Sequence, residues 1–500
     1  MRSKRAFINI LSSLLLQIIT ILCGLVIPRM IIGSYGSAVN GLVSSITQFL
    51  GYIALLEAGV GPVVKSVLYK PIAENNKDLI QQILKSSENF FRKIAYIFIM
   101  YIIALCLFFP ILMQEQFNIL FTLSLVIIIS ISTFSEYYFG MTYRLYLEAD
   151  QKTYIISFIQ VSTYILNTIV VVTLIYIGSS IQVVKLTSAF IFILRPLLQN
   201  LYVKRKYNIS FKNIDKEFNL PQKWDGLAQH IAAVVHNNTD ITILILFSNA
   251  KIVSVYSVYL LVVNGVKNII LSFSSGMDAS FGNMIANNEN ENLNKNFRIY
   301  ELFYFTIVTI IFSLTLLLII PFIKIYTLGI TDVNYIIPAF GYLMVIGEFI
   351  WSIRQPYNEL VKAAGHFKET RNGAWVEAGI NIFVSVILVM HFGIIGVAIG
   401  TLIAMIIRTF EFMYYSSKYI LKRRISIVFK KLIVIILQVV TICLLSVILP
   451  AVEITSFFQW FIYAFEIFIL STFIVICSNI LVYKEERKGL LNLIKHFKKR

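Results

Sequence analysis

The stretch LIVIILQVVTICLLSVILP, residues 432–450, holds no charged residue and is long enough to cross the roughly 30 Å hydrocarbon core of a bilayer as a helix. Similar apolar runs, such as LSLVIIISIS at 123–132, recur along the whole chain. Of the 500 residues, 58% are hydrophobic and 14% are charged, whereas soluble proteins average roughly 25% charged residues. Strands in lipid would instead show short alternating segments. The sequence therefore predicts an all-α, polytopic membrane protein.

Fourteen transmembrane helices are predicted from the apolar windows between polar breaks. They fall at 6–32, 39–69, 90–110, 119–143, 153–178, 183–201, 225–248, 252–275, 298–324, 335–361, 374–391, 394–416, 430–450 and 456–483. The N-terminal tail and the segments after every second span hold 34 of the 43 lysines and arginines, so the positive-inside rule predicts that both termini are cytoplasmic. The net charge of +17 then reflects topology, and no soluble basic domain is long enough to predict a nucleic-acid partner.

The first apolar segment, Ala6 to Ile27, follows Arg2, Lys4 and Arg5 but has no small-residue cleavage site behind a short apolar core. We interpret it as a retained helix of a multi-pass protein of the cell membrane. The four cysteines lie in predicted spans at unrelated spacings, so they indicate neither a disulfide framework nor a metal cluster. No motif predicts a cofactor.

Two parts of the chain resemble each other at a nearly constant offset. Residues 72–76, IAENN, align with residues 285–289, IANNE, at an offset of 213. At offsets of 214 to 216, a second set of residues pairs Ala149, Lys152, Asn167 and Gly178 with Ala364, Lys368, Asn381 and Gly393. We therefore predict two parallel six-helix bundles at 1–210 and 211–425, then two helices at 426–484 and a basic cytoplasmic tail at 485–500. Parallel repeats are a plan of transporters with a substrate site between two halves; chance similarity of low-complexity loops is the alternative.

Charged side chains inside predicted spans are costly in lipid, so we expect them to face a bundle interior or a wet cavity. The residues predicted to line a substrate-binding cavity are Arg29, Glu57, Lys65, Glu136, Lys267, Glu348 and Arg354. Each could instead belong to a satisfied ion pair between helices, or be a basic side chain that extends to the interface. Arg408 and Glu411 are three residues apart and are predicted to pair.

The stretch HNNTD at 236–240 places five polar residues inside one predicted span. His236 and Asp240 are four residues apart and share a helix face, which Asn237 and Thr239 widen into a polar stripe. An acid beside a histidine in a cavity can exchange a proton, and the oxygens of this stripe could bind a sodium ion. These four residues are the predicted ion-coupling candidates, for H+ or Na+. A hydrogen-bonded knot between helices is the alternative.

The loops exclude several classes of function. No outward loop is long enough to hold a sugar donor, so no enzyme is predicted. No GxxxxGK[ST] phosphate loop occurs, which excludes ATP-driven pumping by this chain alone. No filter-like motif or charged ring indicates a channel. A secondary-type carrier remains.

The chain resembles the Wzx-type repeat-unit flippases of the multidrug/oligosaccharidyl-lipid/polysaccharide (MOP) exporter superfamily in its order of six, six and two spans. Two stretches carry the resemblance: TDITILILFSNAKIVSVYSVYLLV at 239–262 and AAGHFKETRNGAWVEAGINIFVSVILVMHFGIIGVAIGTLIAMIIRT at 363–409. The resemblance covers nearly the whole chain through diffuse motifs. It implies a MATE-like fold and a polyprenyl-diphosphate-linked oligosaccharide as the substrate, which is turned to the outer leaflet, where polysaccharide polymerase machinery is an expected partner.

Two alternative functions stay open. A multidrug or toxin extruder of the same fold would use acidic residues for cationic drugs, and Asp240, Glu348, Glu57 and Glu136 fit that role. A scaffold subunit of an envelope-assembly complex, without transport of its own, is the other alternative. For the flippase, lysine and arginine would hold the diphosphate, while amide and hydroxyl side chains would bind the sugars.

Overall fold

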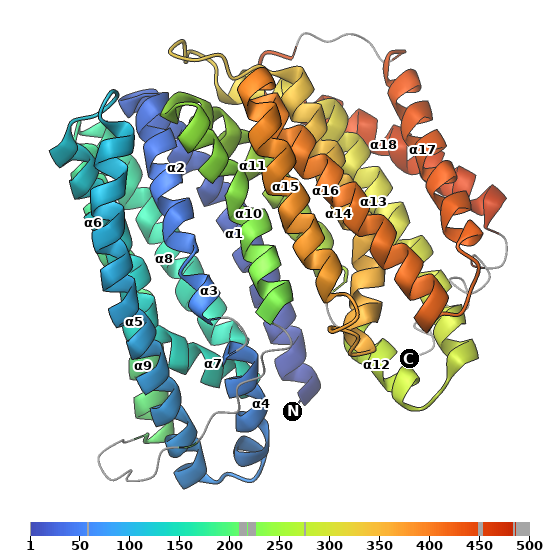
Figure 1. Ribbon diagram of the computed structural model, residues 1–500, viewed down its shortest axis with the longest axis horizontal. Coiled ribbons are helices and arrows are strands. Elements are labelled where there is room, and N and C mark those ends of the chain that lie inside the picture. The colour runs from blue at the N-terminus through green and yellow to red at the C-terminus, as the bar shows by residue number, and fades with distance from the viewer. Residues whose placement is uncertain are drawn as a thin grey trace. The chain divides into compact units, whose positions relative to one another are not determined.

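The computed structural model describes residues 2–57, 60–209, 218, 227–274, 277–448, 454–483 and 486. In this part of the chain every regular element is a helix, as the sequence predicts. The chain divides into two compact units, Met1–Val255 and Tyr256–Arg500. The boundary between these units 1 and 2 falls inside helix α11 (Ala250–Ser272). Figure 1 labels the helices along the chain.

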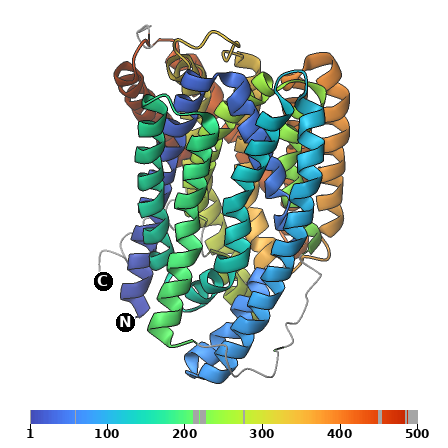
Figure 2. The same ribbon diagram turned by 90° about the vertical axis from the view of Figure 1, so that its left-hand side faces the viewer.

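Unit 1 contains the helices from α1 to α10 and the start of α11. Their bounds are α1 Arg2–Tyr35, α2 Ser37–Gly51, α3 Ala54–Glu57, α4 Val60–Ala73, α5 Lys77–Met113, α6 Ile119–Ser135, the π-helix η1 Glu136–Gly140, α7 Met141–Ala149, α8 Thr153–Tyr176, α9 Ile181–Tyr207 and α10 Leu227–Phe247. Helix α1 packs on α8, and α9 packs on both α6 and α8. Figure 2 shows α4 and the start of α5 at the same end of unit 1 as the beginning of α1.

Unit 2 contains the rest of α11 and the helices that follow it. Their bounds are α12 Met277–Ala286, α13 Asn290–Tyr326, α14 Pro338–Ala363, α15 Arg371–Phe392, α16 Ile394–Tyr415, the π-helix η2 Ser416–Ile420, α17 Ser426–Ser446 and α18 Phe457–Val482. Helices α15 and α16 pack closely, and α14 packs on both α13 and α16. The last two helices pack on each other and on α13.

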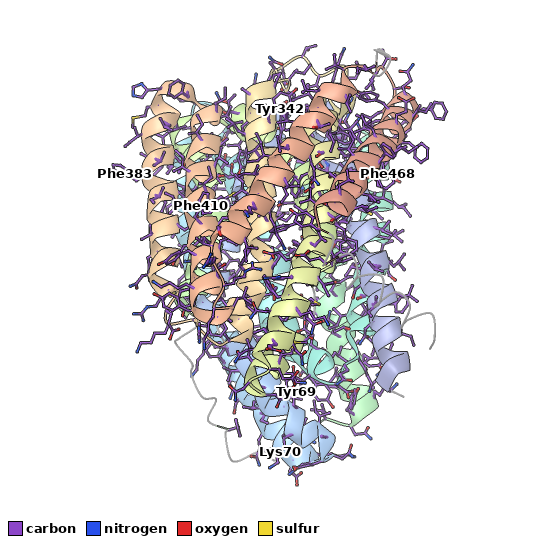
Figure 3. All side chains as sticks on the ribbon, turned by 90° about the vertical axis from the view of Figure 1, so that its right-hand side faces the viewer. Tyr69, Lys70, Tyr342, Phe383, Phe410 and Phe468 are labelled. Carbon is purple, nitrogen blue, oxygen red and sulfur yellow. The ribbon has the colours of Figure 1, made fainter. Side chains whose placement is uncertain are left out.

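Twelve helices of the described residues are long and apolar enough to cross a membrane. Helices α10 and α14 coincide with two further predicted spans but carry more polar sequence, HNNTD in α10 and four charged residues in α14. Apolar side chains also cover the outside of the helices: Phe383, Phe410 and Phe468 project from α15, α16 and α18 in Figure 3. Such a surface suits lipid rather than water. The chain is a multi-pass membrane protein.

The second predicted span of unit 1 is interrupted in the structure. The span predicted at 39–69 is divided into α2, α3 and α4, whereas the span predicted at 252–275 is one helix, α11, which ends at Ser272. The prediction of one continuous span at 39–69 was wrong because apolar length alone ignores glycine. Glycine lowers helix propensity, and Gly51 and Gly61 lie near the interruption. Interrupted helices in transporters often form part of the ligand site.

Helix lengths repeat between the units at the offset seen in the sequence. Helices α5 and α13 each have 37 residues and begin 213 positions apart. Helix α9 covers Ile181–Tyr207, while α16 with η2 covers Ile394–Ile420, again 27 residues and 213 positions later. Asn167 and Asn381, which the sequence pairs, are both buried, at 2% and 0% exposed. The repeat therefore extends from the sequence to the helices and to a buried polar position.

Candidate functional site

Unit 2 contains a buried ion pair between α11 and α14. The Nζ atom of Lys267 lies 3.1 Å from Oε2 and 3.3 Å from Oε1 of Glu348. The two side chains are only 11% and 10% exposed, and the ammonium group lies 4.0 Å from the centre of the Trp351 ring. Both charged residues are sequence-predicted cavity candidates. In the structure each satisfies the other, which is the ion-pair alternative left open by the sequence.

A second series of charges in unit 2 joins α14, α15 and α16. The Nη1 atom of Arg354 lies 2.8 Å from Oε1 of Glu377, and Nε of Arg408 lies 3.5 Å from the other oxygen of that carboxylate. Arg408 also lies 2.5 Å from Glu411, which confirms the predicted local pair. The Phe412 ring centre lies 5.8 Å and 4.3 Å from the two guanidinium groups. Positive and negative side chains thus alternate along the series, and Arg354 has a carboxylate partner.

Unit 1 contains a related network of charges on α4 and on the helix formed by α6, η1 and α7. Lys65 Nζ lies 3.1 Å from Glu148, and Arg144 lies 3.2 Å from the same carboxylate and 3.8 Å from Glu136. These side chains are between 22% and 39% exposed. Partly exposed ion pairs stabilise a protein by only about 0–1 kcal/mol. The network of unit 1 can therefore rearrange at lower cost than the buried pairs of unit 2.

Glu57 and Arg29 lie beside glycines. Glu57 ends α3 at the interrupted helix of unit 1, and the Tyr137 hydroxyl in η1 donates a hydrogen bond to its Oε2 atom over 3.2 Å. A Cβ atom added at Gly61 would lie 3.6 Å from the Glu57 carboxylate, and one added at Gly33 would lie 3.1 Å from Nη1 of Arg29. A side chain at position 33 would therefore press on the Arg29 guanidinium, whereas one at position 61 would make an ordinary contact with Glu57.

Helix α10 carries the HNNTD stretch and packs on α2. Thr239 and Asp240 are buried, each 6% exposed. Gln48 of α2 donates a hydrogen bond to the side-chain oxygen of Asn238, and Tyr52, at the end of α2, interacts with both Thr239 and Asp240. The polar stretch is thus connected to α2 by side-chain contacts, as the hydrogen-bonded knot predicts.

The other two ion-coupling candidates, His236 and Asn237, belong to α10, but their side chains lie outside the described residues. Thr242, one turn beyond Asn238, adds a contact with α2, because its hydroxyl lies 2.9 Å from that of Tyr52. Burial of Asp240 is expected of a coupling residue and of a structural one alike.

A fully buried ionic cluster surrounds Glu301 of α13, and it is not among the sequence predictions. Arg423 donates to both carboxylate oxygens, over 3.0 Å and 2.7 Å, and Lys431 of α17 donates over 2.7 Å. The Tyr357 hydroxyl donates to the same carboxylate. Burial alone would lower the pKa of Arg423, but Glu301 beside it raises that pKa overall. One signal in the sequence could have found the cluster: Glu301 lies in a predicted span, 213 positions after Glu88.

Two further partners are missing from the sequence predictions. Glu148 and Glu377 hold the candidate cations Lys65 and Arg354, yet neither carboxylate is itself a candidate. In the part of the chain that the structure describes, no three His, Cys, Asp or Glu side chains are grouped as a metal site requires.

Neither a protein-family model nor a curated protein sequence matches the chain. Solved structures do match it. The lipid II flippase MurJ, in an inward closed conformation, has a TM-score of 0.68 and 16% identity, and the match covers 94% of this chain and 98% of that one. An inward-facing multidrug resistance MATE family transporter of the MOP superfamily has a TM-score of 0.57 and 17% identity, covering 83% of this chain and 96% of that one. The MATE multidrug transporter DinF-BH has a TM-score of 0.59 and 14% identity, covering 83% and 95%. Identities this low establish a shared fold, and the predicted MATE-like fold is confirmed.

Proposed function

We propose that the chain is a flippase that moves polyprenyl-diphosphate-linked oligosaccharides from the cytoplasmic to the outer leaflet of the cell membrane, by alternating access coupled to an ion gradient. The observation that carries the proposal is the extent of the fold likeness. The structural match to a lipid II flippase covers 94% of the chain. The matches to the multidrug transporters each cover 83% of it, so about a sixth of the chain is not matched. In this proposal the product is then available to polysaccharide polymerase machinery on the outer face.

The charged pairs support a substrate with a diphosphate group. Lys65, Lys267 and Arg354 each pair with a carboxylate. In each pair the carboxylate is an anion that another anion can replace on the same cation. A diphosphate offers the same negative charge to the cation, and arginine can bind it with two parallel hydrogen bonds. In our proposal the diphosphate replaces the carboxylate during transport, so that neither state leaves a buried cation without a counter-charge.

Asp240 is the proposed coupling residue. An ion-driven carrier needs a group whose charge differs between its states, and a buried carboxylate can bind and release a proton or a sodium ion. Asp240 is only 6% exposed and interacts with Tyr52, which a coupling role allows and a structural role allows equally. Asp240 also lies on α10, which packs on α2, the first helix of the interrupted span predicted at 39–69. This position supports the coupling role.

A multidrug or toxin extruder is the second candidate, because MATE transporters share the fold. A site for organic cations needs carboxylates that are not already neutralised. Glu348 is held by Lys267, and Glu136 lies 3.8 Å from Arg144. A cationic substrate would have to displace Lys267 and Arg144 from these carboxylates, just as a diphosphate would have to displace carboxylates from the cations. Nothing in the described residues favours the scaffold alternative.

The proposal can be tested with purified protein in liposomes. A polyprenyl-diphosphate oligosaccharide that carries a fluorescent label on its sugar is placed in the membrane, and a membrane-impermeant quencher reports the fraction in the outer leaflet. We expect protein-dependent flipping that responds to an imposed proton or sodium gradient. Flipping no faster than in protein-free liposomes, together with gradient-driven export of a cationic dye, would establish the extruder instead.

A further inference from the structure

A polar pocket lies at the end of unit 1 where α1 begins, near the Gln151 carbonyl that accepts a hydrogen bond from Asn9 of α1. Its volume is about 710 Å³, which falls in the range of roughly 300–1,000 Å³ that small-molecule sites have. The lining comes from the end of α4, the start of α5 and the ends of α7 and α9, and Figure 2 shows this end of the unit. The positive-inside rule predicts that it is cytoplasmic.

A half-buried group of three side chains, Asp150, Lys152 and Tyr207, forms part of the lining. Lys152 Nζ lies 2.6 Å from Oδ2 of Asp150, and the Tyr207 hydroxyl donates to the same oxygen. Lys152 also donates to the Tyr207 hydroxyl, and Tyr146 packs edge-on against the Tyr207 ring, with the ring centres 4.9 Å apart. Asp150 and Lys152 are only 13% and 12% exposed. An ammonium group has three donors, and these two contacts use two of them.

The remaining polar lining adds positive charge and amide groups. Lys77 and Lys206 line the pocket from α5 and α9 and are exposed to solvent. Together with Lys152 they bring three ammonium groups to a pocket that has one carboxylate, Asp150. The amide side chains of the lining are Asn75, Gln81, Gln151 and Asn208. Ammonium groups bind phosphate, while amide, carboxylate and tyrosine side chains bind the hydroxyls and the apolar face of a sugar.

Unit 2 repeats the backbone that frames this pocket. The described non-glycine residues with left-handed φ angles in unit 1 are Asn75, Gln151 and Asn208, at 53°, 56° and 51°. At offsets of 213 or 214, Asn288, Gly365 and Lys422 have φ angles of 57°, 70° and 50°. These positions end helices, where left-handed caps are common. The backbone frame is therefore a property of the repeat, not of a ligand site.

The side chains of the pocket do not repeat. Aligned by the left-handed positions, at offsets of 213 and 214, Tyr69, Asp150, Lys152 and Tyr207 of unit 1 correspond to Gly282, Ala364, His366 and Leu421 of unit 2. This backbone register replaces the offsets of 215 and 216 by which the sequence pairs Ala149 with Ala364 and Lys152 with Lys368. Unit 2 builds the frame with a different pair, in which the Tyr415 hydroxyl lies 3.0 Å from Nδ1 of His366, so the frame does not require an acid, a lysine and a tyrosine. Burying most of a charged pair also costs desolvation free energy. The three side chains are therefore specific to unit 1 and are not demanded by the backbone frame.

We propose that this pocket is a binding site for a phosphorylated sugar, with Lys77, Lys206 and the third donor of Lys152 on the phosphates and with Asp150 and Tyr207 on the sugar. The ligand is either a soluble nucleotide sugar or the head group of a lipid-linked sugar at the membrane surface, since both present the same chemistry. The proposal concerns binding alone, so a measurement of flipping neither supports nor contradicts it.

Binding is measured by isothermal titration calorimetry with the full-length protein in nanodiscs. The probes are inorganic pyrophosphate, uridine diphosphate glucose and a short-chain prenyl-diphosphate-linked glucose. The double variant Lys77→Ala/Lys206→Ala removes two exposed lysines and should weaken binding of all three probes about tenfold. The variant Asp150→Asn should weaken the two sugar-bearing probes but not pyrophosphate, because it removes a negative charge from beside Lys152. Lys204→Ala, which removes an exposed lysine of the same helix end that does not line the pocket, is the matched control.

Tighter binding of the soluble probe assigns the pocket to nucleotide sugars, and tighter binding of the prenyl probe assigns it to lipid-linked sugars. Three results would overturn the site: no binding of any probe at millimolar concentration, wild-type affinity in the double lysine variant, or equal weakening by Lys204→Ala, which would indicate unspecific attraction by surface charge. A variant that loses binding but still flips lipid-linked oligosaccharide would separate the pocket from transport.

Discussion

The buried pair of Lys267 and Glu348 allows charge pairing to be separated from substrate binding. We consider the single variants Lys267→Met and Glu348→Met and the double variant that carries both. Methionine keeps an unbranched side chain of similar length while removing the charge. Each single variant leaves the other charged group buried without a partner, at about one-tenth exposure, whereas the double variant leaves no charge at all.

Removing one side of a buried ion pair costs about 3–5 kcal/mol, and replacing both sides by apolar residues is often neutral. For Lys267→Met the lost contact with the Trp351 ring, now 4.0 Å from the ammonium, adds about 0.5–2 kcal/mol. With roughly 2–4 °C of melting temperature per kcal/mol for a unit of this size, Glu348→Met should melt about 6–20 °C below the wild type and Lys267→Met about 7–28 °C below it. The double variant should melt close to the wild type.

Melting is followed by tryptophan fluorescence in detergent, and flipping is followed in liposomes with the labelled lipid. If Lys267 binds the diphosphate, the double variant is stable but flips slowly; if the pair is only structural, it is stable and flips normally. The control is Lys70→Met, which breaks an ion pair of 3.9 Å whose side chains are 84% and 53% exposed and should change melting little. Equal melting of the double and single variants would refute the reasoning, because charge coupling would then be absent.

Four further outcomes are expected. Asp240→Asn keeps the shape of a buried side chain but removes its charge, so flipping should lose its ion dependence while the protein remains folded; unchanged ion dependence would exclude Asp240 from coupling. Arg354→Ala should slow flipping more than Arg354→Lys if charge dominates binding, and equally if the planar guanidinium does. Glu301→Gln leaves two buried cations without a counter-charge and should lower the melting temperature by at least as much as Lys267→Met. A single cysteine at position 422 should resist a membrane-impermeant label applied from outside while one at Ser179 reacts, and labelling at 422 would reverse the predicted topology.

Apolar length and charge placement predict the all-helical membrane fold, because both are set by the bilayer rather than by tertiary contacts. The divided second span of unit 1 is the main failure. The apolar run at 39–69 satisfies a length criterion, yet the chain ends α2 at Gly51 and begins α4 at Val60. A glycine-containing segment can leave the helix where neighbouring helices satisfy its backbone. Whether neighbouring helices satisfy the backbone depends on how the helices pack, and the sequence of one segment does not predict that packing.

Local pairs are predictable and distant pairs are not. Arg408 and Glu411 are three residues apart, so helix geometry alone brings them together. Lys65 and Glu148 are separated by 83 positions, and Lys267 and Glu348 by 81. Their pairing depends on which helix faces meet. The sequence identifies these cations as costly to bury, but it does not identify the carboxylates that neutralise them.

The repeat also shows how the two units neutralise the same buried acid in different ways. In unit 1, Glu88 is 7% exposed and pairs with Arg92, four residues along α5, over 2.7 Å. The corresponding acid in unit 2 is Glu301, which is 0% exposed. At the offset of 213, position 305 of α13 holds phenylalanine in place of arginine. The second copy therefore lacks the counter-charge that the first copy carries in its own helix.

Unit 2 takes that counter-charge from beyond the repeat. Arg423 follows the last repeated helix and Lys431 lies in α17, and their side chains are only 5% and 3% exposed where they meet Glu301. Without α17 the carboxylate would stay buried with less positive charge around it, at a cost of several kcal/mol. The last two helices are thus bound to the second copy by a charge requirement as well as by their apolar packing on α13. That requirement arises because position 305 of α13 holds phenylalanine where α5 holds Arg92.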